Sequence, residues 1–538
     1  MKRTAAAMNP LAFLLAIPLL LCTFPSPSRA QETPAERKSA EAPAKEAQRL
    51  RDLGDLYAEQ DKHGEAIDAY RSAIAADPAL TPTLRLSLGK QLLWADRPRE
   101  AIPLLSSAVA ERPDDAEAKR HLALAYRHAD RLKEAEGLYR EVLAVNPADS
   151  DARGGLALTL LWEGRFRAAT PEFERVLADR PADADALVGL SRARLYLDLP
   201  EEAASYNDRA LASSPRNPEA LEQAERIRER LARHLDVAVR GSEDSDDLTL
   251  IESTLSAHGH PRPRWDIDGA VRQLFFRQGS PGKTVNIGQE DSADGTGGSL
   301  SASYRASNAL GWRAGVGHTR YNVGNFHPWS GNFGVSLTPG DTVRFSLEWE
   351  RSHFDSILSL QNQVTADAFS FSASKHFLWK TEITGTAALL FHHNENTTGQ
   401  DRENRGERFT LELSRLLYLR GDDIRVTGLA RLGWLGFSHD LDVGVFDPRR
   451  YTTEEVGLDW QWRFRPLWEF HGTLTGGAQQ EKGHSGGPLY TADLALDRKV
   501  GRGLISLAGF SSDSNARGRG RGEGYRRHGG QLSVSIPF

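Results

Sequence analysis

The chain of 538 residues contains a single cysteine, Cys22, and only two methionines, Met1 and Met8. Because a lone cysteine has no partner within the chain, the sequence excludes a disulfide framework and a thiolate metal site. It also lacks any apolar run of 18 or more residues, which is about the length that a membrane-spanning helix needs. Any membrane crossing by this chain must therefore use strands that close into a barrel.

Positive charge is also in the minority, with 67 Lys and Arg against 73 Asp and Glu. Residues 1–30 begin with Lys2 and Arg3, continue with an apolar stretch and end on small residues before Ala30, which is typical of a secretory signal peptide cut after Ala30. Its removal would delete three basic and no acidic residues, leaving 64 basic against 73 acidic. This acidic balance argues against nucleic acid as a partner.

Prolines recur at intervals of 35, 34, 34 and 34 residues, at Pro78, Pro113, Pro147, Pro181 and Pro215. Twelve positions before each proline stands an alanine: Ala66, Ala101, Ala135, Ala169 and Ala203. Eight positions before it stand Tyr70, Leu105, Tyr139 and Phe173, with Asn207 breaking the series. This period and pattern resemble the tetratricopeptide repeat, in which two helices pack through a small residue and an aromatic or leucine.

We therefore predict a helical solenoid over residues 47–234, with five repeats and a capping helix at 216–234, after a loose polar leader at 31–46. Repeat units must stack because one helix pair cannot bury its own apolar face. The array has two readings, a concave surface for a protein partner or a spacer for the next domain, and the repeat class favours the first.

From residue 235 the period of the pattern changes from helical to two. About sixteen alternating segments follow, joined by short and long links in turn, and the last segment ends on Phe538. An even strand number, alternating link lengths and a terminal aromatic favour an outer-membrane barrel over a soluble all-β domain, the alternative reading. The fold class is thus α+β multidomain: an N-terminal all-α tetratricopeptide-repeat solenoid, then a C-terminal antiparallel transmembrane β-barrel of about sixteen strands over 235–538.

The inward positions of this predicted barrel are polar and charged, which indicates a hydrated lumen. We select Glu348, Glu350 and Asp459 as lining residues of a substrate path. Asp447, Arg449 and Tyr451 are further candidates, at the mouth. The alternative for this second group is a proline-kinked loop that folds into or over the barrel.

The combination of signal peptide, repeat array and barrel resembles bacterial exopolysaccharide export porins with periplasmic repeats, such as the outer-membrane subunit of cellulose synthase and the poly-N-acetylglucosamine export porin. Residues 444–451 look like the Gly-aromatic-Phe/Trp-Ser-Pro-x-x-Tyr stretch of the cellulose-export family, from which Val445 and Asp447 depart. The resemblance implies a place in the outer membrane of a Gram-negative bacterium, with the repeats in the periplasm, and a setting of cellulose biosynthesis and biofilm formation.

In such families the barrel conducts the polysaccharide chain outward, and the repeats scaffold periplasmic or inner-membrane synthase components. The implied partners are therefore the polysaccharide chain, these synthase components and outer-membrane lipids. The alternative is an outer-membrane-anchored scaffold or assembly protein that transports no polymer.

Enzymatic chemistry is not expected. Residues 483–488 resemble the nucleophile stretch of chymotrypsin-like proteases, but the sequence shows no matching base or orienting group. His392 with His393, or His258 with His260, could bind zinc, yet no further ligands follow at useful spacing, so we expect no metal and no cofactor. The arginine-glycine tract at 517–522 is predicted to be a flexible cationic extracellular loop.

Overall fold

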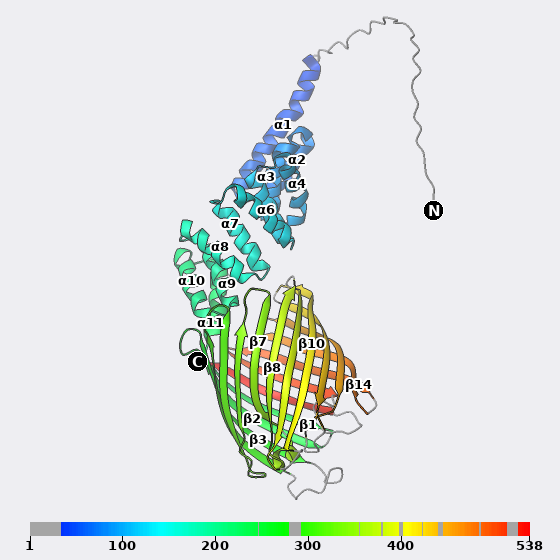
Figure 1. Ribbon diagram of the computed structural model, residues 1–538. Helices are drawn as coiled ribbons and strands as arrows, with labels where there is room; N and C mark the ends of the chain where they lie inside the picture. Colours follow the sequence, from blue (N-terminus) through cyan, green and yellow to red (C-terminus); the bar gives the residue numbers. More distant parts are fainter. Residues whose placement is uncertain are drawn as a thin grey trace, which may run out of the picture. The chain divides into compact units, whose positions relative to one another are not determined.

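The structure, a computed structural model, describes residues 34–245, 247–278, 292–354, 356–377, 380–396, 402–421, 423–439, 445–483, 486–513 and 526–538. The signal peptide expected at 1–30 and the tract at 517–522 lie outside these ranges. The chain divides into two compact units, Met1–Asp114 and Asp115–Phe538. Figure 1 shows helices over the first part of the chain and strands over the rest.

The described part of the first unit is helical, with α1 Pro34–Glu59, α2 His63–Ala76, the 3₁₀ helix η1 Pro78–Leu80, α3 Thr81–Trp94 and α4 Pro98–Glu111. Helix α1 corrects the loose leader expected at 31–46, because it already begins at Pro34. The physical reason is local: this stretch is rich in Ala, Glu, Lys and Arg, which are strong helix formers, and proline is well tolerated in the first helical turn.

Close approach of helices explains the small residues of the repeat pattern. A Cβ atom on Gly54 would lie 2.6 Å from the ring of Tyr70, so α1 and α2 meet at this glycine. Tyr70 is 2 % exposed and its hydroxyl donates a hydrogen bond of 2.7 Å to Asp55. Burial, followed by that bond to Asp55, raises the pKa of Tyr70 above its usual range.

The second unit begins with seven helices: α5 Ala116–His128, α6 Leu132–Val145, α7 Ser150–Trp162, α8 Phe166–Asp179, α9 Ala184–Tyr196, α10 Pro200–Ser213 and α11 Pro218–Leu231. Helices α5, α7, α9 and α11 each begin after a capping residue whose side chain accepts a hydrogen bond from a backbone N–H of the first turn. These capping residues recur every 34 positions: Asp115, Asp149, Asp183 and Asn217. The capping side chains thus pair backbone N–H groups that would otherwise lack a partner at the same point of each repeat. None of the described helices has the length and apolarity that a membrane span requires.

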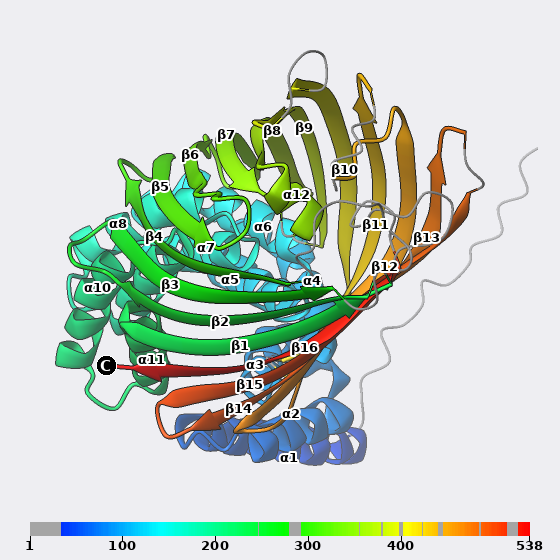
Figure 2. The same cartoon turned by 90° about the horizontal axis from the view of Figure 1, so that it is seen from below.

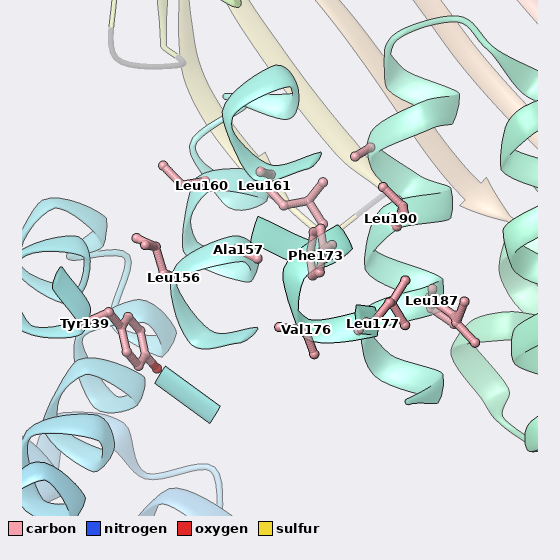
Figure 3. Close-up of a cluster of buried hydrophobic side chains, with 14 of the residues drawn as sticks. Tyr139, Leu156, Ala157, Leu160, Leu161, Phe173, Val176, Leu177, Leu187 and Leu190 are labelled. Atoms are coloured by element: carbon pink, nitrogen blue, oxygen red, sulfur yellow. The ribbon is translucent and has the colours of Figure 1, made fainter. Parts of the chain in front are cut away.

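These helices share one apolar core (Figure 3), in which Tyr139, Leu156 and Phe173 are each at most 5 % exposed. Gly189 has no room for a side chain, because an added Cβ would overlap the ring of Phe173. The residues spaced by the repeat period therefore form the contacts between neighbouring helix pairs, as the pattern predicts.

Sixteen antiparallel strands follow and close into a barrel, confirming the predicted strand number. They are β1 His234–Asp244, β2 Leu248–Gly259, β3 Trp265–Gln278, β4 Ser292–Arg305, β5 Leu310–Tyr321, β6 Trp329–Leu337, β7 Val343–His353, β8 Val364–Phe377, β9 Thr381–Asn394, β10 Glu403–Arg420, β11 Ile424–Phe437, β12 Tyr451–Arg465, β13 Trp468–Glu481, β14 Gly487–Val500, β15 Gly503–Asp513 and β16 Arg526–Pro537. Closure occurs where β1 pairs with β16, with His234 opposite Pro537.

We call the end of the barrel at His234 and Pro537 the proximal end and the opposite one the distal end. Proximal links have two to five residues, as at 466–467 and 260–264. Most distal links are longer, and one of them contains the short helix α12 Ile357–Gln361. The predicted alternation of short and long links has two exceptions, because the distal links at 245–247 and 482–486 have only three and five residues.

The two faces of the barrel wall differ in chemistry. Large apolar side chains on alternate positions are exposed outward, for example Leu347 at 62 % and Val456 at 67 %. The terminal strand follows the same rule, with exposed Leu532, Ile536 and Phe538. An apolar outer surface around a closed barrel is the arrangement that hydrocarbon favours, so the domain is an outer-membrane-type barrel.

Within the second unit, a proximal turn of the barrel contacts the helices. The carboxylate of Asp341 accepts hydrogen bonds from the backbone N–H groups of Arg167 (2.8 Å) and Ala168 (3.2 Å). These are among the first amides of α8, where an anionic side chain is favourable because the helix leaves them unpaired. Arg264 also forms an ion pair of 3.0 Å with Glu202.

Candidate functional site: the lumen of the barrel

One wall of the lumen is built from small side chains. Strands β4, β5 and β6 place mainly glycine and hydroxyl or amide residues on the face opposite to exposed Leu300, Val316 and Phe333. These small residues are Gly295, Gly297, Ser299, Ser301, Ser303, Gly311, Gly315, Gly317, Thr319, Ser330, Asn332, Gly334 and Ser336. Such a wall leaves space beside it and offers hydroxyl donors and acceptors.

A second wall carries carboxylates. Strands β12, β13 and β14 direct acidic side chains to the face opposite to exposed Val456, Leu474 and Leu494, namely Glu455, Asp459, Glu469, Asp493 and Asp497. The hydroxyl of Thr473 donates to Asp459 (3.0 Å), and that of Thr475 donates to Glu455 (3.0 Å). Asp459 pairs across the sheet with Thr473, which pairs with Asp493, so this row crosses three strands.

The two walls face each other, because β5 and β13 lie eight strands apart in a ring of sixteen. At the edge of the small-residue wall, Glu348 on β7 forms an ion pair of 2.8 Å with Arg313 on β5. This pair passes over Gly334 on the intervening strand, where a Cβ would meet both side chains at 3.2–3.4 Å. Glu350, two positions further along β7, is exposed on the same face as Glu348.

The distal mouth is narrowed from inside by the link that carries α12. Ile357 and Leu360 of α12 are at most 6 % exposed. They belong to an apolar cluster with inward residues of β2 to β5, including Leu274, Phe276 and Tyr321. In Figure 2, α12 is drawn within the ring of strands, consistent with this packing.

A second segment, residues 445–450, also folds inward at the distal mouth. Val445 packs with Val364, the first residue of β8, although Val445 precedes β12 and three strands separate the two. Asp447 is 1 % exposed, and its carboxylate accepts a hydrogen bond of 2.7 Å from the side-chain amide of Asn404, also 1 % exposed. We call this hydrogen bond the Asn404–Asp447 latch.

The latch is continued by Tyr451, which is 3 % exposed at the start of β12. Its hydroxyl donates a hydrogen bond of 2.7 Å to Gln479 on β13, and its ring packs edge-on against Phe446 at 5.1 Å between centroids. Arg449 remains exposed. The segment is thus built into the wall, in keeping with the loop alternative that the sequence left open.

The six residues selected from the sequence therefore fall into three places. Asp447 and Tyr451 come together at the distal mouth, with Arg449 exposed beside them. Glu348 and Glu350 share β7, whereas Asp459 lies apart on β12. The sequence selection missed Asn404 and Arg313, the partners of Asp447 and Glu348, because each comes from a distant strand.

The helices of the second unit carry an exposed aromatic series. His128, Trp162 and Tyr196 are the last residues of α5, α7 and α9, spaced by 34. Trp162 is 44 % exposed and Tyr196 58 % exposed, and His128 lies 6.0 Å from the Trp162 ring. Arg127 lies 5.7 Å from the same ring, and burial lowers the pKa of its guanidinium. Exposed aromatics in a row are characteristic of protein-binding surfaces.

The protein thus combines tetratricopeptide repeats with a closed sixteen-strand barrel of outer-membrane type. Two models of the tetratricopeptide repeat match residues 92–159 and 155–218. No curated protein matches the chain.

The solved structures that are similar to parts of the chain include the following three. A bacterial polysaccharide outer membrane secretin shares 12 % identity, covers 57 % of this chain and 99 % of its own, and has a TM-score of 0.45. The MamA protein shares 25 % identity over 32 % of this chain and 94 % of its own, with a TM-score of 0.27. A thermophilic tetratricopeptide repeat protein from Thermus thermophilus shares 19 % identity over 34 % of this chain and 98 % of its own, with a TM-score of 0.30.

Proposed function

We propose that the barrel is a pore that conducts a secreted polysaccharide from the periplasm to the cell surface. In this proposal the repeat array lies in the periplasm and holds components of the machinery that makes the polymer. The observation that carries the proposal is the pair of opposed walls in the lumen, one of small hydroxyl-bearing residues and one of carboxylates.

The chemistry of these walls suits a moving sugar chain. A polysaccharide presents dense hydroxyl groups, which exchange hydrogen bonds with serine, threonine and carboxylate side chains. Because each such bond contributes only about 0.5–1.5 kcal/mol net, many of them can guide a chain without holding it at one point. The glycines of β4 to β6 leave room for a bulky chain beside that wall.

The exposed aromatic series at Trp162 and Tyr196 supports the role of the array. Large rigid side chains bury much apolar area at low entropic cost, so they serve as anchors in protein interfaces. We propose that a periplasmic or inner-membrane synthase component docks there.

The sharpest test uses two neighbouring residues of β4. Ser301 faces the lumen, whereas Leu300 faces outward and is 57 % exposed. Ser301→Trp should narrow the path and reduce polymer in the medium, while Leu300→Trp, the matched control, should leave export unchanged. Both variants must reach the outer membrane in equal amounts. Normal export by Ser301→Trp would contradict conduction through this lumen.

A chromosomal deletion tests the proposal at the level of the cell. Polysaccharide is quantified separately in the medium and in the periplasm. Export through this protein predicts loss of polymer outside with accumulation or degradation inside. Unchanged secretion would reject the exporter.

A second candidate is an outer-membrane-anchored scaffold without polymer transport, and the inward packing of α12 at the distal mouth favours it. The two candidate functions predict different results for one pair of variants. If the barrel is only an anchor, Trp162→Ala in the array impairs polymer production while Ser301→Trp does nothing. If the barrel conducts the polymer, Ser301→Trp alone is sufficient to reduce export.

A further inference from the structure

Two histidines meet at the proximal end of the lumen. His258 is near the end of β2, and His260 follows in the link to β3. Their Nε2 atoms lie 3.4 Å apart, and the rings are almost perpendicular, at 88°. The side chain of His260 is only 7 % exposed. So close an approach of two ring nitrogens must be stabilised by something that both can bind.

The other nitrogen of each ring is engaged by a carboxylate. His260 Nδ1 lies 2.5 Å from Asp266 Oδ1, and His258 Nδ1 lies 2.5 Å from Asp268 Oδ1. Ser303 donates a hydrogen bond of 3.0 Å to the second oxygen of Asp266, which fixes that carboxylate in place. Because an ionised carboxylate only accepts hydrogen bonds, both Nδ1 atoms carry the proton.

This assignment leaves the two Nε2 atoms as the sites that a cation would bridge. With a proton on Nδ1, a neutral imidazole has a lone pair on Nε2. Two lone pairs facing each other at 3.4 Å repel unless a cation lies between them. A proton on one Nε2 is the other possible bridge; at 3.4 Å it would make a long hydrogen bond, and the metal titration below distinguishes the two.

A metal ion fits the spacing. Zinc binds histidine nitrogens at about 2.0–2.1 Å, and two such bonds at a tetrahedral angle place the nitrogens about 3.3–3.4 Å apart. Histidine ligands of metals typically donate their other N–H to a carboxylate, which is the role of Asp266 and Asp268 here. His234 pairs with His258 across β1 and β2, but its Nδ1 lies 3.4 Å from the Ser535 hydroxyl on β16, so we do not count it among the ligands.

We propose that His258 and His260 bind a divalent transition-metal ion such as Zn²⁺ through their Nε2 atoms, with Asp266 and Asp268 orienting the rings. The possible ligand atoms of His258, His260 and Asp266 all lie within 4.8 Å of one another, so a carboxylate oxygen stands close to the two ring nitrogens. The sequence identifies this histidine pair but predicts no metal, because the carboxylates come from β3, across the turn, and not at a recognisable ligand spacing. The ion would join β2 to the link at the proximal mouth, independently of whether a polymer passes.

The test uses the full chain in detergent, with any affinity tag removed and metal stripped by a chelator. Co²⁺ is added as a spectroscopic probe, and Zn²⁺ is then used to displace it. We expect the visible absorption of tetrahedral Co²⁺, lost on addition of Zn²⁺. His258→Gln should abolish the signal, and Asp268→Asn should weaken affinity by about 10- to 100-fold.

His471→Gln is the matched control, because His471 also faces the lumen and lies 3.3 Å from a carboxylate, that of Asp497. It should bind Co²⁺ as the unchanged protein does. The heat-dependent gel mobility of each variant shows that the barrel is folded. The proposal is overturned if the unchanged protein gives no Co²⁺ spectrum, if folded His258→Gln binds equally well, or if His471→Gln loses the signal to the same degree.

Discussion

The Asn404–Asp447 latch makes a direct prediction about the distal mouth. Asn404→Asp keeps the shape of the side chain but replaces the amide donor with a second carboxylate, next to an oxygen that now lies 2.7 Å away. The change removes a hydrogen bond to a charged group, which contributes about 1.5–3 kcal/mol. Because about 1.4 kcal/mol corresponds to tenfold, the ratio of released to docked segment should rise by about 10- to 150-fold.

The assay is single-channel recording of the purified protein in planar bilayers. Asn404→Asp should increase the frequency of high-conductance openings, since residues 445–450 would no longer be held against the inner wall. Arg449→Gln serves as a control in the same segment, because its side chain is exposed. It should leave the opening frequency unchanged.

The exchanged pair, Asn404→Asp with Asp447→Asn, separates the latch from a general loss of structure. It restores one donor and one acceptor between the two side chains, although not the bond from Asn404 to the His439 carbonyl. We therefore expect the opening frequency to fall most of the way back. Equal opening by the single variant and the unchanged protein, or no recovery in the exchanged pair, would refute the reasoning.

Three further predictions concern the array, the outer surface and the charged wall. Phe173→Ala should destabilise the helices by about 3–5 kcal/mol, since the ring of Phe173 is 1 % exposed. Far-UV circular dichroism during denaturation measures the change in the free energy of unfolding. A loss of stability no larger than that of Leu221→Ala, at an exposed position, would contradict the prediction. Val456→Arg should lower the amount of barrel in membranes, at a cost of about 2–4 kcal/mol where it faces lipid; unchanged membrane content would contradict an outward, lipid-facing residue. Asp459→Asn with Asp493→Asn should reduce selectivity for cations, read as a shift in reversal potential under a salt gradient; no shift would place these carboxylates outside the conducting path.

Local patterns were sufficient for the fold. The 34-residue period predicts which side chains fill the core of the array, because equivalent residues of each repeat pack at equivalent places. Tyr139 and Phe173, which are 34 positions apart, are both buried in this core. Alternation predicts which face of a strand points outward, and exposed Leu347 and Val456 confirm it. The start of α1 at Pro34 was missed because a polar stretch gives no apolar period, although its residues favour helix.

The site was harder to predict, because its contacts join residues far apart in the chain. Asn404 and Asp447 are separated by 43 positions, and no spacing rule connects them. The ion pair of Glu348 with Arg313 depends on strand order and register, which together place the two side chains over Gly334. Sequence alone identifies such residues as inward and polar, but their pairing follows from the closed barrel.

One signal in the sequence does point to the inward-folded segments. A water-filled lumen disfavours apolar side chains on its wall, so an apolar residue at an inward position needs something to cover it. Leu250, Leu274 and Phe276 are such residues, close to the distal ends of β2 and β3, and α12 covers them. Away from that end, the inward positions of the small-residue wall, such as Ser301 and Gly315, carry no large apolar side chain. Large apolar residues at inward positions near one end of the strands therefore indicate where a segment packs inside the barrel, and in this protein that end is the distal mouth.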